Sequence, residues 1–210
     1  MKRGCDLLLV LLFAPVWAAA LLAVALLVRF RLGKPVLFRQ LRPGKNGVPF
    51  ELIKYRSMLS ARGAVGKLLP DANRLTPLGR WLRASSLDEL PELINVLRGE
   101  MSLVGPRPLL MEYLDRYTPE QSRRHEVRPG LTGWAQVNGR NAISWEEKFK
   151  LDVWYVEHQS LWLDAKILCL TFGKVIRREG IHAADEATMP EFLGEGGPKS
   201  RDEKSRTAPC

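Results

Sequence analysis

The distribution of hydrophobic positions divides the chain into an apolar segment near the N-terminus and a longer region in which apolar residues recur periodically. Residues 7–28 contain no charged side chain, and a helix of about 20 apolar residues is long enough to span the hydrocarbon core of a bilayer. Pro15 lies inside this run and removes a helical hydrogen bond. We therefore expect residues 1–32 to form a membrane helix with a hinge at Pro15.

Residues 33–182 carry the mixed pattern of a folded domain. Residues 35–58 are predicted to form short extended pieces separated by turns, with Asn46-Gly47 typical of a hairpin. Periodic leucines predict a helix over residues 87–97 that ends at Gly99, and Pro91 makes its start late or irregular. Amphipathic segments with helical spacing also lie at 76–84, 109–124, 144–157 and 161–177. The predicted fold class is α/β, mostly helical with a small sheet or hairpin.

The C-terminal residues 183–210 differ from the rest of the chain in composition. They are rich in glycine, proline, serine and charged residues, and such a segment buries too little apolar surface to offset the entropy of ordering it. We expect a disordered tail, so that the chain consists of a membrane helix, a folded domain and this tail.

The overall charge narrows the class of partner. The chain has 32 Lys and Arg against 23 Asp and Glu, a net charge of +9, which suits nucleic acid, an anionic membrane surface or phosphorylated substrates. The three cysteines, Cys5, Cys169 and Cys210, are far apart, and no CxxC motif or histidine cluster accompanies them. A disulfide framework or a zinc site is therefore not expected.

Three interpretations of the apolar run differ in the topology they give its flanks. A signal peptide would be cleaved near residues 18–20, but the run continues past that point and a basic segment follows. Basic residues such as Arg3 and Arg29 flank both ends, and basic flanks prefer the cytoplasmic side. A reentrant helix, which enters and leaves on one face, satisfies both flanks. A kinked spanning helix is the alternative, and the residues alone favour it because kinked spans are tolerated.

Two adjacent carboxylates, Asp88 and Glu89, stand at the predicted start of the leucine-rich helix. The structural interpretation is a capping box of Ser86 and Glu89, in which the acids also complement the helix dipole. In the functional interpretation one carboxylate holds Mg²⁺, which prefers oxygen ligands and substrate phosphates, and the other attacks phosphorus. Neighbouring basic residues would keep such a nucleophile ionised.

Basic residues and glycines supply candidate phosphate contacts. Arg107 lies between two prolines, which fix its main chain and lower the entropy its guanidinium loses on meeting a phosphate; the alternative is a surface turn with an incidental arginine. Lys54 and Arg56 end an extended segment, as phosphate contacts or as a solvated edge. The glycines of residues 128–140 let the main chain approach a diphosphate, although glycine-rich turns are common.

Five ordered motifs carry a resemblance to a known family. They are KR..D at residues 2–6, P..F.Q.R.G..G..F...K.R.M at 35–58, R.T.LG..LR.SSLDELPEL.NVL.G.MSLVGPRP at 74–108, RPGLTGWAQVNGR at 128–140 and LD.WY…S…D at 151–164. With these motifs the chain resembles the bacterial sugar transferase family, the monotopic phosphoglycosyl transferases that prime glycoconjugate synthesis.

The resemblance implies a fold, a reaction and a set of site residues. It implies a reentrant helix hinged at Ala14-Pro15 and a catalytic region with interfacial amphipathic helices on the cytosolic face of the bacterial inner membrane. It implies a two-step transfer of sugar-1-phosphate from a UDP-sugar to polyprenyl (undecaprenyl) phosphate, with Asp88 as nucleophile, UMP as leaving group and Glu89 as a ligand of Mg²⁺. The implied substrate-binding or phosphate-binding residues are Lys54, Arg56, Arg83, Arg107, Gln136, Gly139 and Arg140.

The chain also departs from the family pattern. Ala14 stands where the family often has serine, so a hydroxyl that could rebond the broken helix is absent and the hinge is shallower or uses another donor. Glu100 follows Gly99 where the family has aspartate, which we expect to be conservative. The tail after residue 182 matches no family pattern.

Two other function classes compete with the enzyme. A membrane-tethered basic protein that binds lipid headgroups or nucleic acid would explain the charge but not the ordered motifs, and the sequence has no RNP or zinc-finger pattern. A secreted protein would lose its first ~20 residues. We expect inner-membrane lipid and no nucleic acid among the partners, and we favour a homodimer. The sequence does not identify the sugar.

Overall fold

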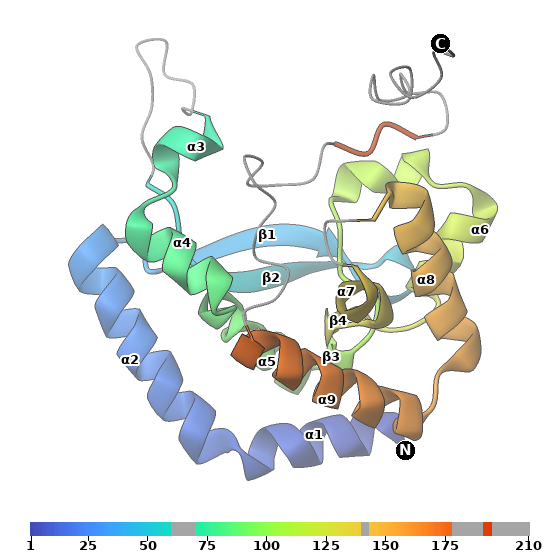
Figure 1. The fold of residues 1–210 in the computed structure, drawn as a ribbon, viewed down its shortest axis with the longest axis horizontal. Helices are drawn as coiled ribbons and strands as arrows, with labels where there is room; N and C mark the ends of the chain where they lie inside the picture. The colour runs from blue at the N-terminus through green and yellow to red at the C-terminus, as the bar shows by residue number, and fades with distance from the viewer. Residues whose placement is uncertain (60–69, 140–142, 178–190, 195–210) are drawn as a thin grey trace, which may run out of the picture.

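The computed structural model describes residues 1–59, 70–139, 143–177 and 191–194, and it confirms a mostly helical fold with small sheets (Figure 1). The helices are α1 (Lys2–Leu12), α2 (Ala14–Leu32), α3 (Asp71–Arg74), α4 (Pro77–Ala84), α5 (Glu92–Arg98), α6 (Pro119–Ser122), α7 (Trp134–Asn138), α8 (Trp145–His158) and α9 (Leu161–Arg177). The strands are β1 (Leu37–Pro43), β2 (Pro49–Tyr55), β3 (Ser102–Val104) and β4 (Gly130–Thr132). Short 3-10 turns are η1 (Lys45–Gly47), η2 (Leu87–Glu89), η3 (Met111–Arg116) and η4 (Arg123–His125).

The β1–β2 hairpin confirms the extended pieces expected between residues 35 and 58. Its strands pair antiparallel, with Leu37 opposite Tyr55 and Pro43 opposite Pro49. The turn contains Asn46 at φ 56° and Gly47 at φ 74°, a left-handed conformation that asparagine and glycine adopt at low cost. The second sheet is a parallel pair of β3 and β4, which the sequence pattern does not predict.

The N-terminal apolar segment is broken into two helices next to Pro15. Phe13 leaves the helical conformation at φ −92° and ψ 9°, and Pro15 lies in the first turn of α2. Ala14 offers no hydroxyl at the break, but Trp17 Nε1 donates a hydrogen bond of 2.7 Å to Val10 O. The indole is therefore the alternative donor that stabilises the last turn of α1.

Both arms of this helix pair contact the same folded body. On α1, Lys2 pairs with Asp164 of α9 and Asp6 accepts a hydrogen bond of 2.8 Å from Ser102 Oγ. On α2, Leu21 O accepts a hydrogen bond of 2.6 Å from Tyr55 Oη. Of the described helices, α2 is long and apolar enough to cross a membrane, judged by length and composition. The exposed apolar side chains of the pair include Leu8, Leu11, Leu12, Phe13, Val16, Leu22, Leu26 and Phe30.

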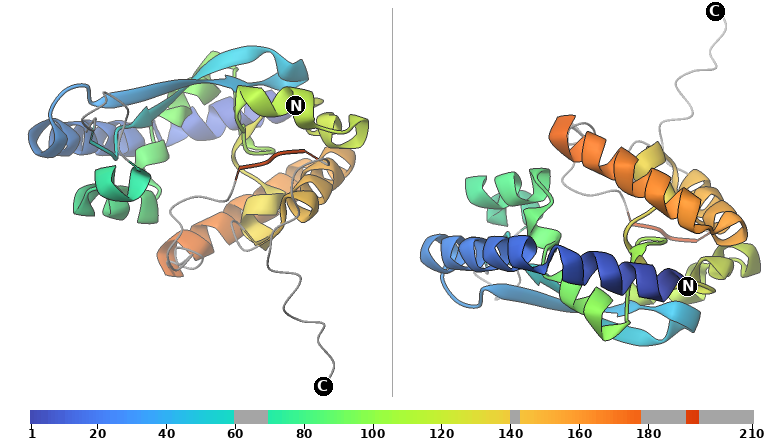
Figure 2. Two further views of the ribbon diagram at one scale, coloured as in Figure 1. Left: turned by 90° about the horizontal axis from the view of Figure 1, so that it is seen from above. Right: turned by 90° about the horizontal axis from the view of Figure 1, so that it is seen from below.

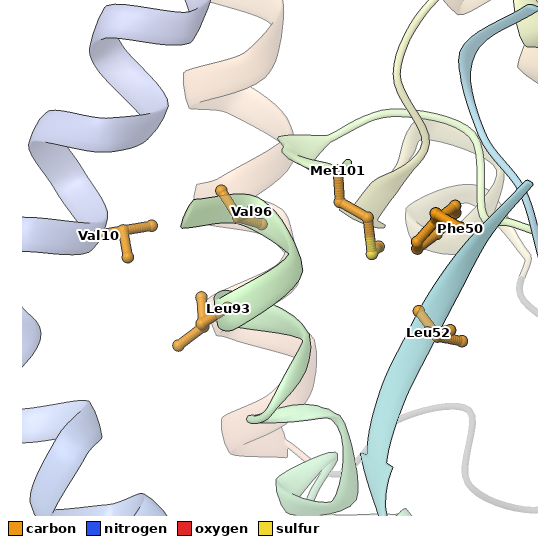
Figure 3. Packing of buried hydrophobic residues seen from close by; sticks show 6 residues of the cluster. All are labelled: Val10, Phe50, Leu52, Leu93, Val96 and Met101. Atoms are coloured by element: carbon orange, nitrogen blue, oxygen red, sulfur yellow. The ribbon is translucent and has the colours of Figure 1, made fainter. Parts of the chain in front are cut away.

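A hydrophobic cluster joins α1, α5 and β2. Its buried members are Val10, Phe50, Leu52, Leu93, Val96 and Met101 (Figure 3). Asn95 of α5 is fully buried beside it, where its Oδ1 accepts from Ile53 N at 3.2 Å and its Nδ2 donates to Glu51 O at 2.7 Å. These bonds fix β2 against α5, so that Lys54, the next residue on the strand, lies beside the start of that helix.

Two segments differ from the sequence prediction. Residues 109–124 are not one amphipathic helix, because Thr118-Pro119 starts a new one: the Thr118 side chain accepts from Gln121 N in a capping box, and η3 and η4 flank the short α6. Residues 191–194, part of the expected disordered tail, pack against the body, and Phe192 is 7% exposed.

Candidate active site

The two adjacent acids lie on a tight turn between α4 and α5. Ser86 adopts a left-handed conformation at φ 55° and makes no side-chain cap, so the capping box expected of Ser86 and Glu89 is wrong. Leu87 and Leu90 on either side pack against the cluster of Val28, Tyr55 and Leu82. Pro91 then precedes α5, which confirms that the helix starts late. Leu87 and Leu90 therefore fix the position of η2, and the carboxylates of Asp88 and Glu89 remain available to charged partners.

Glu89 is held by two cations from separate parts of the chain. Lys54 Nζ of β2 lies 3.0 Å from Glu89 Oε1, and Arg107 Nη2 from the loop after β3 bonds to the same oxygen. The structure thus brings together three of the residues expected in the site. Because both cations reach Oε1, they leave Oε2 of Glu89 without a partner among the residues that the structure describes.

A third carboxylate, Glu92, belongs to the same cluster and was missed in the sequence. It is the first residue of α5, is 2% exposed, and its Oε1 lies 3.0 Å from Lys54 Nζ. Burial raises the pKa of Glu92 to about 7, against the charge of Lys54. Its spacing of three residues from Glu89 placed it on the same side of a helical turn, and that was the signal available.

The environment separates the protonation of Asp88 and Glu89. Burial raises the pKa of Asp88 to about 6, and the neighbouring charge of Glu89 adds to the effect, whereas Lys54, Arg107 and Arg83 oppose it. Burial would also raise the pKa of Glu89, but the charges and hydrogen bonds of Arg107 and Lys54 outweigh burial and hold it well below its usual range. Glu89 therefore stays anionic, whereas the pKa of Asp88 lies above the usual range of an aspartate.

A buried ion pair, which the sequence did not indicate, holds the main chain of the loop that carries Arg107. Arg124 Nη2 donates to Arg107 O at 2.8 Å and pairs with Asp152 Oδ2 at 2.7 Å. Both partners of the pair are almost completely buried. Since a buried guanidinium with its carboxylate is directionally bonded, Arg124 fixes the main chain between the two prolines.

The other arginines expected in the site differ in position. Arg83 of α4 donates to Ser57 Oγ at 3.0 Å, and its charge acts on Asp88. Arg56 instead donates to the main-chain oxygens of Leu32 and Lys34, so its described bonds secure the end of α2 and do not reach Glu89. Arg140 lies outside the described residues.

A cavity of about 210 Å³ opens beside Glu89. Its apolar walls include Leu103 of β3 and Leu168 of α9, and Gln136 of α7 lines it as well. Gln136 Nε2 donates to Leu131 O at 3.2 Å, while its Oε1 is buried without a hydrogen-bond partner in the described part of the chain. Gly139 ends α7 against the side chain of Ile143. The other polar lining residues include Thr132, Thr171 and Lys174.

The donor set can be tested for Mg²⁺. Among residues 1–59, 70–139, 143–177 and 191–194, no group of three His, Cys, Asp or Glu side chains could hold a metal ion. Mg²⁺ is nevertheless often bound by one or two carboxylates together with substrate phosphates and water. The free Oε2 of Glu89, at the wall of the cavity, fits such a shared site.

Comparison with known proteins gives the chain its family. The model of the family described as Bacterial sugar transferase matches residues 1–178. The uncharacterized sugar transferase EpsL of Bacillus subtilis (strain 168) is 54% identical over 196 residues, which cover 93% of this chain and 97% of that protein. A UDP-glucose:undecaprenyl-phosphate glucose-1-phosphate transferase of Caulobacter vibrioides is 38% identical over 191 residues, 86% of this chain and 72% of that protein.

A longer relative shows the same match over a smaller part of its length. The UDP-glucose:undecaprenyl-phosphate glucose-1-phosphate transferase of Escherichia coli (strain K12) is 38% identical over 184 residues, which are 83% of this chain and 40% of that protein. The matched region includes Lys54, Asp88, Glu89 and Arg107, the residues that the fold brings together. The chain therefore belongs to the bacterial sugar transferase family and is an enzyme of the phosphoglycosyl transferase class.

Proposed function

We propose that the protein transfers a sugar-1-phosphate from a UDP-sugar to polyprenyl phosphate, with release of UMP and formation of a polyprenyl-diphosphate-sugar. The observation that carries the proposal is the buried carboxylate of Asp88 next to Glu89. Lys54 and Arg107 both pair with Glu89, and Glu89 lines the cavity. Acids that only complement a helix dipole have no reason to be buried among cations. Relatives named as undecaprenyl-phosphate sugar transferases support the same reaction.

In the first step a carboxylate oxygen of Asp88 attacks the phosphorus that bears the sugar. A bond forms between this oxygen and phosphorus, the bond from phosphorus to the bridging oxygen breaks, and UMP leaves with the electron pair. The charges of Lys54, Arg107 and Arg83 act on Asp88, so they would also stabilise the phosphoryl oxygens of a substrate bound next to it. Asp88 needs its ionised form to attack, and these three cations favour that form.

In the second step a phosphate oxygen of polyprenyl phosphate attacks the same phosphorus. The bond between phosphorus and Asp88 breaks, the carboxylate is regenerated, and the product keeps the sugar on a diphosphate. The apolar walls of the cavity, which include Leu103 and Leu168, suit a substrate whose phosphate is joined to a hydrocarbon chain. Gln136 Oε1, buried without a described partner, is an acceptor for a substrate hydroxyl or amide.

Mg²⁺ is proposed as the cofactor, held by Glu89 Oε2 together with substrate phosphate oxygens. Bound there, it would neutralise negative charge on the diphosphate. Lys54 and Arg107 keep the Glu89 carboxylate ionised and oriented through its other oxygen. In this arrangement Glu89 positions charge and Asp88 forms the covalent bond.

The α1–α2 pair is proposed to be a reentrant anchor in the cytoplasmic face of the bacterial inner membrane. Both arms contact one body, and the apolar side chains around the break at Phe13 are exposed. Burying those side chains in lipid is favourable, whereas α2 as an independent span would have to leave the contacts that Leu21 and Val28 make with the body.

The test of the reaction is UMP release by the detergent-purified protein with Mg²⁺, undecaprenyl phosphate and a panel of UDP-sugars. Asp88→Asn keeps the shape of the side chain but removes its nucleophilic charge, and we expect the rate to fall about a thousandfold or more. Glu112→Gln, a change at an exposed acid, is the matched control and should keep the wild-type rate.

The outcome also separates the enzyme from a basic lipid-binding protein. UMP release with one sugar that is lost in Asp88→Asn, together with loss of a covalent sugar-phosphate adduct by intact mass, would support both the reaction and the nucleophile. Release that persists in Asp88→Asn would remove Asp88 from this role. Salt-sensitive lipid binding without any release would favour the binding protein.

A further inference from the structure

Residues 191–194 form a short strap against the body of the protein, drawn in red beside α8 in Figure 2. Phe192 is 7% exposed, and its main-chain N donates a hydrogen bond of 3.2 Å to Tyr113 Oη. Arg116 Nη1 donates to Glu191 Oε1 at 2.7 Å and to Phe192 O at 2.5 Å. Main-chain hydrogen bonds, an ion pair and apolar contacts together therefore hold the strap against the body of the protein.

Phe192 contacts both aromatic rings that cover the guanidinium of Arg124. Its ring centroid lies 5.7 Å from that of Tyr117 and 5.0 Å from that of Phe149. The Arg124 Cζ atom lies 5.8 Å from the Tyr117 centroid and 5.5 Å from the Phe149 centroid. Phe192 thus closes an aromatic wall around a cation that is 2% exposed.

Arg124 in turn connects this wall to the loop of Arg107. Its Nη1 donates to Tyr117 Oη at 3.2 Å, its Nε donates to Asp152 Oδ2 at 3.1 Å, and its Nη2 donates to Arg107 O at 2.8 Å. A planar guanidinium engaged through all three nitrogens has one orientation. Movement of Tyr117 or Phe149 therefore disturbs the bond to the Arg107 main chain.

We propose that the strap is a positioning element for residues 105–108, the loop that carries Arg107. Phe192 holds Tyr117 and Phe149 against Arg124, Arg124 holds the Arg107 carbonyl, and the Arg107 side chain is thereby kept at Glu89. The catalytic consequence rests on the proposed function, whereas the mechanical link does not. The strap lies beyond residue 178, where the match to the family model ends.

The test uses full-length protein and compares neighbouring residues of the strap. Phe192→Ala removes the buried ring, and Leu193→Ala, at a side chain that is 50% exposed, is the matched control. Tyr117→Phe keeps the stacked ring but removes the hydroxyl that accepts from Arg124. Hydrogen–deuterium exchange of peptides covering residues 103–110 reports on the loop, α5 serves as the internal reference, and UMP release reports on the reaction.

We expect exchange in residues 103–110 to become about tenfold faster in Phe192→Ala and in Tyr117→Phe, with α5 unchanged. Leu193→Ala should behave as wild type, and UMP release should slow about fivefold or more in the two loosened variants. Unchanged exchange in residues 103–110, or faster exchange that extends through α5, would overturn the proposal, because Phe192 would then only stabilise the fold in general.

A second variant and the wild-type activity allow the remaining outcomes to be interpreted. If Phe192→Ala does not fold, Phe192→Leu, which keeps most of the apolar volume without the ring, must show the local effect or the proposal fails. Absence of UMP release from the wild type would count against the proposed function alone, since exchange does not depend on the reaction. A loosened loop with wild-type UMP release would overturn the catalytic role of the strap.

Discussion

Burial acts on three carboxylates within five positions of one another, yet it leaves them with different protonation. Asp88 and Glu92 have raised pKa values because burial disfavours their charged forms. Glu89 stays anionic because both Arg107 and Lys54 reach it. Lys54 is shared between Glu89 and Glu92, so its loss would leave a nearly fully buried carboxylate without its cation.

His125 gives the fold a pH dependence that is separate from the reaction. Burial lowers the pKa of His125 to about 4 from 6.5, the charge of Arg124 adds to this, and a hydrogen bond with the main chain of Gly44 acts in the opposite direction. On acidification His125 therefore takes up a proton at a higher pH in the unfolded chain than in the folded protein. We expect the free energy of unfolding to fall as the pH drops from 6.5 towards 4, by about 2 kcal/mol between pH 8 and pH 5.

Chemical unfolding of the wild type and of His125→Gln over this pH range measures the effect. The variant cannot take up the proton and should lack this part of the acid loss. Equal loss in both proteins would show that other groups account for the acid sensitivity.

The site could be predicted from the sequence only where its chemistry is carried by local motifs. Asp88-Glu89 and Arg107 stand in distinctive local sequences, and the fold brings them together with Lys54. Arg124 and Asp152, which fix the Arg107 loop, are ordinary charged residues 28 positions apart. Their role comes from burial by distant segments, and no periodicity reports that.

At the scale of elements, the site depends on a close main-chain crossing of β3 and β4. A Cβ atom on Gly105 would collide with the main chain of Arg128 and Gly130, and Gly105 N donates to Thr132 O at 2.9 Å. Glycine is required here because two segments approach with no room for a side chain.

We expect Gly105→Ala to lower the free energy of unfolding by about 3 kcal/mol or more, because main chain cannot yield as a side chain does. Gly173→Ala is the control, since a Cβ atom there meets nothing within 4 Å, and it should leave stability unchanged or slightly higher. Thermal unfolding of both variants measures the difference. A Gly105→Ala protein as stable as the control would contradict the close crossing.

The elements with complete local signals were predicted well. Thr76 and Pro77 begin α4 as a cap and first residue should, and α8 and α9 fall within a residue of the expected 144–157 and 161–177. The β3–β4 pair escaped prediction because its strands are three residues each and pair across a long separation in sequence. Strands so short carry no measurable alternation.

At the scale of the whole molecule, the helix pair frames the body along one side (Figure 1). The α1 arm is tied to α5, β3 and α9, and the α2 arm to β2 and α4. A chain that passed straight through a bilayer would place these two sets of contacts on opposite faces, although they belong to one body. This arrangement supports the proposed reentrant topology.

Cysteine labelling tests the topology in a background in which Cys5, Cys169 and Cys210 are replaced by serine. We expect Gly4→Cys and Arg31→Cys to react with an impermeant reagent from the same face of the membrane, and Phe13→Cys at the break to be protected by lipid. Labelling of positions 4 and 31 from opposite faces would show a spanning helix.

The glycine crossing has a consequence for how the enzyme can open. Gly105 N bonds to Thr132 O at 2.9 Å and Gly130 N bonds to Pro106 O at 3.0 Å, with no side chain between them that could change rotamer. These main-chain bonds couple the loop of Arg107 to the segment that leads to Gln136, whereas Leu87 of η2 packs against the cluster of Val28, Tyr55 and Leu82. We therefore expect Arg107 and Gln136 to move together in any main-chain movement of this part of the fold, so that their contacts to a bound substrate would form or break at the same time.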